Sequence, residues 1–497
     1  MSLGPRLFLG FWLFFMIAGR SRLFKDPGTF WHTRVGDLVL ERGYFKSDPF
    51  TFTHAGQHWI PHQWLGEVGM ALAYRVAGLD TFLLLAATLL ASLFTWLTLR
   101  LTRTGLHVSV AGVIACVVLA ATATHLHVRP ILATTVFLAV FTALLTDFDD
   151  GRMRLARLLW LLPLTILWTN LHGGVLGGLA SFGLVIVGWI TWTILGWPTP
   201  VRSKSIAFRL MALLAVCCLS VLINPYFLVI PTTWLKIMQG SRIAAYLEEH
   251  QPLDPASPNA FGLLALAALY LAVLAGTLPR RPQVTWLLPL FWLLQSVFRV
   301  RHAPLFAMTA FVAIASMWPH TIYARRLLKR PDLYDPQRAM ASSLRAWLMP
   351  ACVVLITFIL QISSVTVPVF GAGWAQSDPA RWPVSLVLRI RECPPGDVFT
   401  DLNLGGWLSF QASQFKTFID DRVELYSDDF LDDYIAGSGD GGPAAALPRW
   451  EARYGRFPYA LVQPRTPFAN YFANSPDWKL VAEDAAGQFY ERQDHSK

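Results

Sequence analysis

The sequence predicts a polytopic α-helical membrane protein of about 11 transmembrane helices, with a large first outer loop and a small α/β domain at its C-terminus. Of the 497 residues, 54% are hydrophobic and only 15% are charged, which is too little charge for a soluble chain of this length. Apolar runs such as Thr81–Leu99 and Met211–Ile230 recur, and each is long enough to cross about 30 Å of hydrocarbon. The composition becomes polar after residue 370, so we expect a membrane domain over 1–370 and a separate α/β domain over 371–497.

The charge and the cysteines exclude two other classes of protein. The formal net charge is +9, but Lys and Arg gather in alternate short loops, as the positive-inside rule expects, and not in a nucleic-acid-binding patch. Four of the five cysteines fall in apolar runs, which leaves Cys393 alone outside them. We therefore expect neither a nucleic-acid partner nor a disulfide framework.

The first span is followed by an outer loop, residues 20–79, that is polar, aromatic and rich in His and Asp. The N-terminal apolar run resembles a signal peptide, but no small-residue cleavage site precedes Arg20, so we interpret it as a retained span. Asp26-Pro27 predicts the start of a helix that ends at Gly43 and lies along the membrane interface. A second short helix is expected over 63–76, with an extended piece at 50–53 between the two.

Eleven spans are expected, with boundaries good to a few residues. They are Leu7–Ala18, Asp80–Leu101, Val108–Thr124, Ile131–Leu145, Leu158–Thr169, Val175–Leu195, Met211–Ile230, Asn259–Leu278, Thr285–Phe298, Pro304–Trp318 and Trp347–Phe370. The loops after the even-numbered spans carry the Arg and Lys residues. This pattern predicts a cytoplasmic N-terminus and an extracytoplasmic C-terminal domain.

The C-terminal domain shows short apolar runs separated by helical stretches. We expect strands at 397–400, 416–419 and 459–463, a final hairpin of 478–482 with 488–491, helices at 384–392 and 447–454, and a flexible loop over Gly437–Gly442. This spacing is typical of a small α/β domain.

Ionisable and amide side chains gather at the outer ends of the predicted spans and in the outer loops. They are Asp26, His32, His62, Glu67, His125, His127, Arg129, Asn170, His172, Glu248, Glu249, His250, Arg299, Arg301 and His302. Each such group would cost roughly 2.5–3.5 kcal/mol at the centre of a span, so their position at one boundary indicates use there. A transporter would place them near the membrane midplane. The arrangement suits an enzyme that handles a lipid-bound polar substrate at the outer surface.

The topology and three short motifs resemble the GT-C superfamily of membrane glycosyltransferases. The motifs are the Asp26–His32 run after the first span, the Trp168–Gly174 run (WTNLHGG), and Asn224-Pro225-Tyr226. Relatives in this superfamily include protein O-mannosyltransferases, aminoarabinose transferases and oligosaccharyltransferase catalytic subunits. Where the mannosyltransferases carry an Asp-Glu pair, Asp26 here is followed by Pro27. The resemblance implies a polyprenyl-phosphate-linked sugar donor and inverting transfer to an acceptor hydroxyl.

The predicted site follows from this chemistry. An acceptor hydroxyl needs a base within hydrogen-bonding reach, and the candidate is Asp26. The leaving lipid phosphate needs cations, which Arg129, Arg301 and His302 can supply. The other expected substrate-binding residues are His32, His62, Glu67, His125, Asn170, His172 and Glu248. A divalent metal ion is compatible with these groups because some relatives use one, but no spacing in the sequence requires it.

Several residues also have simpler interpretations. Asp26 could only cap a helix, His172 could only end a span, and Arg299 and Arg301 could only anchor a helix at the interface. Asp48-Pro49 is more typical of a turn. Asp420-Asp421-Arg422 is more typical of an internal salt-bridge corner than of a substrate site.

The sequence thus predicts an inverting membrane glycosyltransferase on the outer face of a bacterial inner membrane, in the cell envelope. Its partners would be the lipid-linked donor, a glycan, lipid or protein acceptor, and membrane lipids. Two alternatives stay open. One is a non-catalytic membrane scaffold of envelope glycan assembly, and the other is a transporter of lipid-linked glycans.

Overall fold

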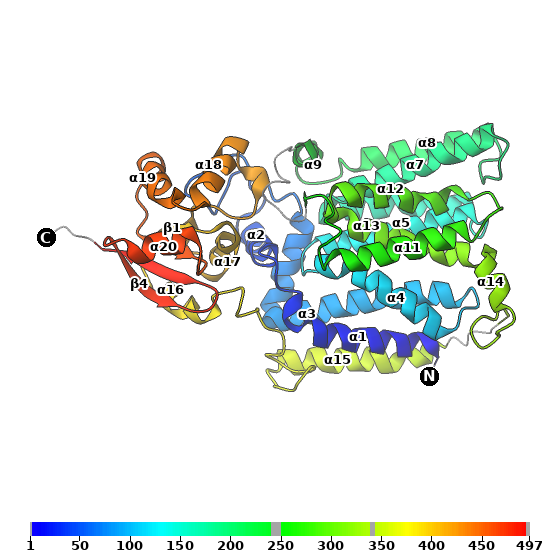
Figure 1. Cartoon of the computed structure of the whole chain (residues 1–497), viewed down its shortest axis with the longest axis horizontal. Coiled ribbons are helices and arrows are strands. Elements are labelled where there is room, and N and C mark those ends of the chain that lie inside the picture. Colours follow the sequence, from blue (N-terminus) through cyan, green and yellow to red (C-terminus); the bar gives the residue numbers. More distant parts are fainter. Residues whose placement is uncertain (1, 240–249, 338–342, 494–497) are drawn as a thin grey trace.

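The structure, a computed structural model, describes residues 2–239, 250–337 and 343–493. A bundle of long helices and a sheet with short helices lie end to end along the long axis of the molecule (Figure 1). The helices of the first part are α1 (Leu3–Arg22), α2 (Gly28–Arg42), α3 (Trp64–Thr102), α4 (Val108–Thr122), α5 (Ile131–Asp149), α6 (Leu161–Leu171), α7 (Val175–Ile194), α8 (Lys204–Ser220), α9 (Val229–Gln239), α11 (Ala260–Ala275), α12 (Val284–Phe298), α13 (Ala303–Met317), α14 (Ile322–Leu327) and α15 (Leu348–Ile362).

The length and apolar composition of these helices confirm a mostly helical membrane protein. Within the described residues, seven helices are long and apolar enough to cross a membrane: Leu3–Arg22, Trp64–Thr102, Val108–His125, Ile131–Asp149, Val175–Ile194, Val300–His320 and Leu344–Ile362. Three shorter apolar stretches, Leu155–Leu171, Ala260–Ala275 and Val284–Phe298, accompany them. The expected number of eleven spans stays a prediction.

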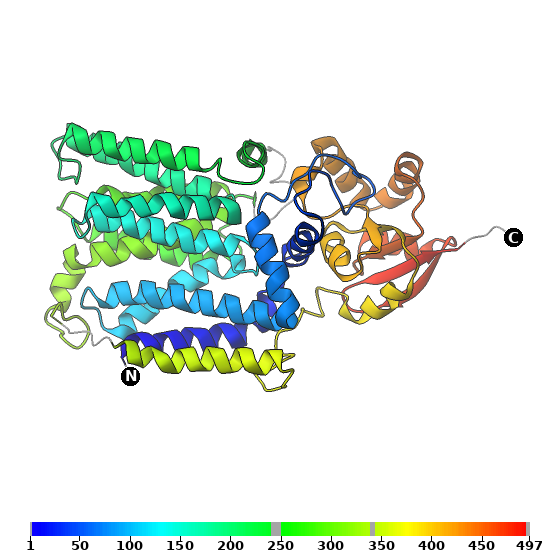
Figure 2. The ribbon, with the colours of Figure 1, turned by 180° about the vertical axis from the view of Figure 1, so that it is seen from behind.

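Helix α3 bends at the boundary that the sequence predicts between two helices. Ala77 has a φ of −151°, and Gly78 has a φ of +61° with a ψ of −136°, a conformation that glycine adopts without strain. Residues before the bend lie across the end of the bundle, and residues after it run along the bundle (Figures 1 and 2). Helices α2 and α9 also lie across this end (Figures 1 and 2).

Two expected spans are shorter than the sequence suggests. Helix α8 ends at Ser220, and the chain turns at Asn224, whose side-chain oxygen accepts the N–H of Tyr226 at 2.8 Å. Pro225 cannot donate a backbone hydrogen bond, so the helix does not continue to Ile230. Helix α15 ends at Ile362, eight residues before the expected end.

The C-terminal part contains a mixed five-stranded sheet in the order β2-β1-β3-β5-β4. Its elements are α16 (Val387–Glu392), β1 (Gly396–Thr400), α17 (Leu402–Gln411), β2 (Phe415–Thr417), α18 (Asp428–Ser438), α19 (Gly442–Tyr454), β3 (Tyr459–Val462), α20 (Pro467–Asn474), β4 (Trp478–Glu483) and β5 (Gln488–Arg492). Strand β1 pairs in parallel with β2 and β3, and β4 and β5 form the expected antiparallel hairpin. Gly437 belongs to α18, so the loop expected over 437–442 is shorter than predicted.

The first outer loop packs against the sheet. Thr51 forms a parallel bridge with Thr417, so the loop covers the free edge of β2. Trp31, Val35 and Phe50 share a buried apolar cluster with residues of the sheet such as Phe418. The apolar face of α2 therefore contacts the C-terminal part and not the lipid interface that the sequence predicts, because this packing removes the same side chains from water.

Candidate active site

A cavity of about 270 Å³ lies where the end of the helical bundle meets the C-terminal part. It is lined by side chains from the first outer loop, from the ends of several bundle helices and from the segment after β2. The polar and charged ones are Trp31, His62, Gln63, Arg129, Thr134, Thr135, His172, His250, Arg299, Arg301, His302, Asp421 and Glu424. Apolar side chains such as Trp234, Ile237, Met238 and Trp292 line the rest. The cavity thus offers both an apolar wall and a set of charges.

The arginines of the cavity stand at the ends of membrane helices. Helix α12 ends at Phe298, and Arg299 adopts an extended conformation with a φ of −147°. A single turn, Val300–His302, then leads into α13. Arg299, Arg301 and His302 therefore lie close together at the end of the bundle, where they line the cavity. The side chain of Arg301 hydrogen-bonds to His250. Three positive or protonatable groups are therefore gathered at one helix junction.

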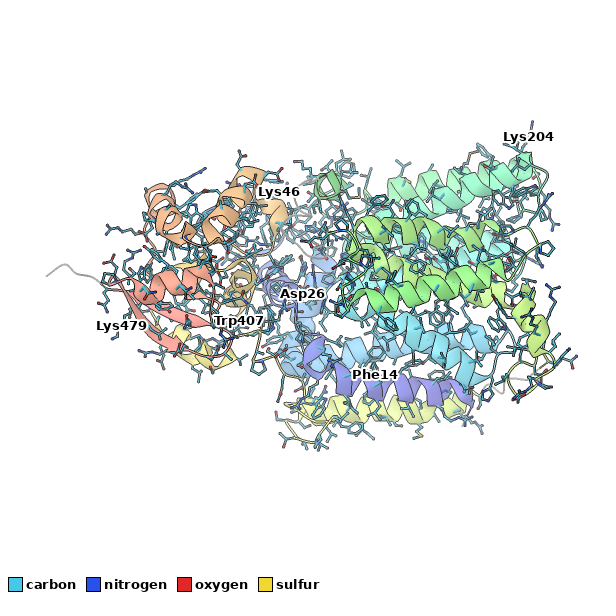
Figure 3. All side chains as sticks on the ribbon, in the orientation of Figure 1. Phe14, Asp26, Lys46, Lys204, Trp407 and Lys479 are labelled. Atoms are coloured by element: carbon cyan, nitrogen blue, oxygen red, sulfur yellow. The ribbon has the colours of Figure 1, made fainter. Side chains whose placement is uncertain are left out.

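Arg129 precedes α5 and connects the cavity to Asp26. Its Nη1 donates to Oδ2 of Asp26 at 2.6 Å. The other oxygen of Asp26, Oδ1, accepts the backbone N–H of Gly28 at 2.7 Å, which caps the start of α2. Asp26 lies at the junction of the two parts of the molecule (Figure 3). It does not line the cavity itself, but its partner Arg129 does. Both oxygens of Asp26 are engaged by protein donors.

His172 lines the cavity in a defined tautomer. The backbone N–H of Gly174 donates to Nδ1 of His172 at 2.9 Å, and the hydroxyl of Thr134 lies 2.8 Å from the same nitrogen. A backbone N–H can only donate, so Nδ1 is an acceptor and the proton of the neutral ring resides on Nε2. Nε2 of the neutral His172 ring is therefore a hydrogen-bond donor.

The carboxylates of the cavity come from the C-terminal part. Asp421 Oδ2 accepts the indole N–H of Trp31 at 3.0 Å, and Glu424 Oε1 accepts that of Trp59 at 3.1 Å. Burial, reinforced by the negative charges of Asp26 and Asp420, raises the pKa of Asp421 to about 8. A carboxyl group with such a pKa exchanges its proton near neutral pH.

Arg422 lies between these two carboxylates in the sequence. Its side chain is fully buried and does not line the cavity. Its guanidinium group bonds to Asp420 at 2.6 Å and to Asp48 at 2.7 Å, and it lies over the rings of Phe50 and Trp59. Asp48 therefore has two functions: it forms the expected turn by accepting backbone N–H groups, and it ties the first loop to the sheet. The Arg422 network fixes the position of the segment that carries Asp421 and Glu424.

A second buried polar pair lies beside the cavity. Nδ1 of His32 and Oε1 of Glu67 are 2.8 Å apart, and both side chains are completely buried. Burial, with the nearby charge of Arg129, lowers the pKa of His32 well below its usual value. Burial also lowers the pKa of His62, which keeps this cavity-lining ring neutral at pH 7.

The structure brings some of the predicted site residues together and separates others. The cavity is lined by six of the residues that the sequence places at the outer boundary: His62, Arg129, His172, Arg299, Arg301 and His302. Asp26, His32 and Glu67 do not line it, although Asp26 binds Arg129. His125 lies beside Thr124, and Asn170 bonds to Trp64 and to the backbone of Ile223. Glu248 and Glu249 lie outside the described residues.

Asp421 is the cavity residue that the sequence does not single out. The Asp-Asp-Arg run is typical of a salt-bridge corner, and this holds for Asp420 and Arg422 only. The available signal was the run of three charges directly after a predicted strand.

The described residues do not offer a metal site. Across 2–239, 250–337 and 343–493, no group of three or more His, Cys, Asp or Glu side chains could hold a metal ion. The carboxylate of Asp26 is engaged by Arg129 and by Gly28.

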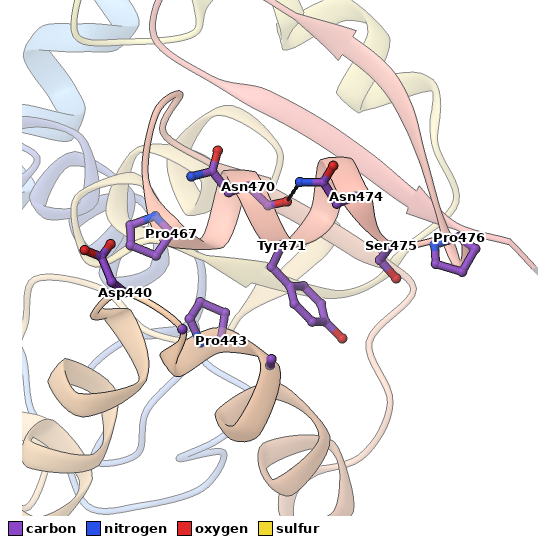
Figure 4. Close-up of a pocket in the computed structure, with 10 residues that line it drawn as sticks. Asp440, Pro443, Pro467, Asn470, Tyr471, Asn474, Ser475 and Pro476 are labelled. Atoms are coloured by element: carbon purple, nitrogen blue, oxygen red, sulfur yellow. Dashed lines mark hydrogen bonds between the residues drawn. The ribbon is translucent and has the colours of Figure 1, made fainter.

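A second hollow lies on the surface of the C-terminal part, between the start of α19 and the length of α20 (Figure 4). Asn470, Asn474 and Tyr471 line it together with several prolines, and Asp440 is its one charged residue within the described chain. It lacks the clustered charges of the cavity at the bundle end.

Comparisons with known proteins concern the fold. No protein-family model matches the chain, and no curated protein matches its sequence. Among solved structures, the apo form of the Archaeoglobus fulgidus oligosaccharyltransferase is similar over 93% of this chain and 69% of its own length, with a TM-score of 0.50 and 12% identity. The same enzyme tethered to an acceptor peptide containing the NVT sequon has a TM-score of 0.53 and 12% identity, over 88% of this chain and 65% of its own.

A third similar structure is the archaeal oligosaccharyltransferase AglB from Archaeoglobus fulgidus in complex with an inhibitory peptide and a dolichol-phosphate. It matches at a TM-score of 0.51 and 11% identity, over 93% of this chain and 69% of its own. The chain thus has a fold similar to that of oligosaccharyltransferases, one of the groups of GT-C relatives that the sequence resembles.

Proposed function

We propose that this chain is an integral membrane glycosyltransferase that transfers a sugar from a polyprenyl-phosphate carrier to an acceptor hydroxyl with inversion. The observation that carries the proposal is the cavity at the bundle end, where cations from membrane helices meet carboxylates from the C-terminal part. The similar fold of the oligosaccharyltransferases supports the proposal, since one of them is complexed with dolichol-phosphate.

In this proposal the cations bind the phosphate of the donor. Arg129, Arg299 and Arg301 lie at the ends of membrane helices, where the phosphate of a lipid embedded in the bilayer would also lie. A guanidinium group can bind two phosphate oxygens at once and stays charged at every physiological pH. The departing lipid phosphate carries additional negative charge, so the same groups stabilise it as the bond to the sugar breaks.

The apolar wall of the cavity would hold the first part of the lipid chain. Trp234, Ile237 and Met238 belong to α9, which lies across the bundle end, and Trp292 belongs to α12. This wall adjoins the arginines of the α12–α13 junction. A ligand with an apolar tail next to a phosphate therefore matches the lining better than a free sugar does.

Asp26, which the sequence predicts as the base, enters the proposal through its contact with Arg129. Its carboxylate contacts Arg129, so it stands next to the expected phosphate site. The proposed location is the inner membrane of a bacterium, with the N-terminus in the cytoplasm and the cavity outside. The alternation of Lys and Arg along the loops supports this orientation.

A binding experiment tests the donor class. Purified protein in nanodiscs would be titrated with undecaprenyl phosphate, dolichyl phosphate and the corresponding free alcohols. We expect binding of the phosphates but not of the alcohols, and a loss of about 10- to 100-fold in affinity for Arg301→Gln, since a hydrogen bond to a charged group contributes about 1.5–3 kcal/mol. Equal binding of alcohols and phosphates would contradict the assignment. Binding without any turnover would favour the scaffold.

A further inference from the structure

The carboxylates of the cavity and its cations come from opposite parts of the molecule. Arg129, Arg299 and Arg301 belong to the membrane bundle, whereas Asp421 and Glu424 belong to the C-terminal part. When the bundle binds the donor phosphate, the C-terminal side of the cavity is therefore available to the acceptor. In an inverting transfer the acceptor attacks the face of the sugar opposite the phosphate, so the base must stand on that side.

Asp421 is the better placed of the two candidate bases, Asp26 and Asp421. Asp26 lies outside the cavity lining, and its two oxygens are taken by Arg129 and Gly28. Asp421 lines the cavity, and only its Oδ2 has a hydrogen-bond donor, Trp31. Its Oδ1 is buried and has no hydrogen-bond partner within the described parts of the chain. A buried carboxylate oxygen without a donor makes the ionised form costly, so the Asp421 carboxylate gains by taking up a proton, as a base does.

From this placement we infer that Asp421, contributed by the C-terminal part, accepts the proton of the acceptor hydroxyl, while Asp26 orients Arg129 toward the donor phosphate. This inference rests on the proposed glycosyl transfer and names the base of that site. Arg422, locked between Asp48 and Asp420, is a positioning residue that holds Asp421 at the cavity wall.

The proposed step conserves atoms and charge. The acceptor oxygen forms a bond to the anomeric carbon of the sugar as the bond from that carbon to the phosphate oxygen breaks. The electron pair of the broken bond leaves with the lipid phosphate. The hydroxyl proton moves to the Asp421 carboxylate, which becomes neutral and later releases the proton to water. No oxidant, reductant or metal ion enters the step.

The ionisation of Asp421 agrees with this role. Its pKa of about 8 results from burial and from the charges of Asp26 and Asp420, which outweigh the opposite effect of Arg129. His62 and Glu424 also line the cavity. A base works best when its pKa lies near the working pH. Activity should therefore rise with pH through about 8 as Asp421 loses its proton.

The test compares wild type, Asp421→Asn, Asp421→Glu and Asp26→Asn, with Asp429→Asn as a matched control. Asp429 is an exposed aspartate of α18 in the same part of the chain. Each protein would be incubated in nanodiscs with polyprenyl-phosphate sugars and a panel of hydroxyl acceptors, and release of polyprenyl phosphate would be followed by mass spectrometry. General base catalysis contributes about 10²–10⁴-fold, so we expect Asp421→Asn to lower kcat at least about 100-fold with little change in KM.

The pH profile separates a base from a structural residue. Wild type should show an apparent pKa near 8 that shifts in Asp421→Glu and disappears from the residual activity of Asp421→Asn. Turnover by Asp421→Asn within tenfold of wild type would overturn the inference and leave the proposed function intact. Absence of both turnover and lipid phosphate binding in wild type would overturn the proposed function and the inference with it.

An infrared titration covers the case in which wild type binds lipid phosphate but the acceptor panel gives no turnover. The carbonyl stretch of a protonated carboxyl group should disappear near pH 8 in wild type and be missing in Asp421→Asn. A carboxyl band of the same size and pH dependence in both proteins would overturn the inference.

Discussion

Replacing Arg422 by methionine should strongly destabilise the contact between the first outer loop and the sheet. Arg422 is fully buried and neutralises Asp48 and Asp420, with bonds of 2.7 and 2.6 Å. Its guanidinium carbon also lies 4.8 Å from the ring of Phe50 and 4.6 Å from that of Trp59. Removing one partner of a buried ion pair costs about 3–5 kcal/mol, because an unpaired charge stays behind. We expect Arg422→Met to lower the free energy of unfolding by that amount.

Guanidinium unfolding followed by tryptophan fluorescence would measure the loss, since Trp59 stacks on Arg422. Arg449→Met is the matched control: Arg449 pairs with Asp433 on the surface, where an ion pair contributes about 0–1 kcal/mol. Adding Asp48→Asn to Arg422→Met should recover part of the loss by neutralising one of the abandoned carboxylates. A loss for Arg422→Met no larger than for Arg449→Met would refute the reasoning.

The same variant should show a characteristic pH dependence. Burial alone would raise the pKa of Asp48, but the charge and hydrogen bonds of Arg422 hold it below its usual value. The stabilisation that Asp48 provides is thus complete above its unfolded pKa of about 4 and is lost as the pH falls through the lower folded value. The difference in stability between wild type and Arg422→Met should shrink as the pH is lowered below about 4.

Three further predictions concern the cavity and the packing of α17. Asp421→Asn should raise the unfolding temperature, and this gain should grow from about pH 4 to pH 8. Over that range the unfolded state loses the proton of Asp421 while the folded state keeps it, because the folded pKa is raised, so ionisation increasingly favours unfolding. A gain independent of pH would contradict this explanation. Gly405→Ala should lower the free energy of unfolding by more than about 2 kcal/mol, since the new Cβ would lie 1.9 Å from the carbonyl oxygen of Ile419. An unchanged temperature of thermal unfolding would contradict this prediction. Asp26→Asn should weaken binding of dolichyl phosphate through Arg129, and unchanged affinity would contradict the link between them.

The sequence predicts the local structure well where each segment has its own pattern. The strands of the tail, its final hairpin and the bend in α3 at Gly78 lie where apolar runs and glycines place them. Asn224-Pro225 is a helix-breaking pair, but it lies inside a long apolar run that predicts a continuous span. Run length alone cannot show where a helix stops inside an apolar segment.

Contacts between distant segments could not be predicted. The apolar face of α2 matches a membrane interface as well as a protein core, and only the tertiary structure shows that it packs on the sheet. The same holds for Asp421 and Arg422, two neighbouring charges that point to a cavity and to a buried network. Arg129 and Arg301 do line the cavity, because each stands at the end of an apolar helix, a position that the sequence alone reveals.

The most direct test of the account is release of polyprenyl phosphate by the purified protein. Wild type would be incubated in nanodiscs with a panel of polyprenyl-phosphate sugars and acceptors, and the free lipid phosphate followed by mass spectrometry, with Arg129→Gln/Arg301→Gln as the variant that lacks phosphate-binding cations. We expect release by wild type and at least about a hundredfold less by the double variant, from the loss of about 1.5–3 kcal/mol per charged hydrogen bond. Equal release by both proteins, or neither release nor binding of lipid phosphate by wild type, would contradict the central claim.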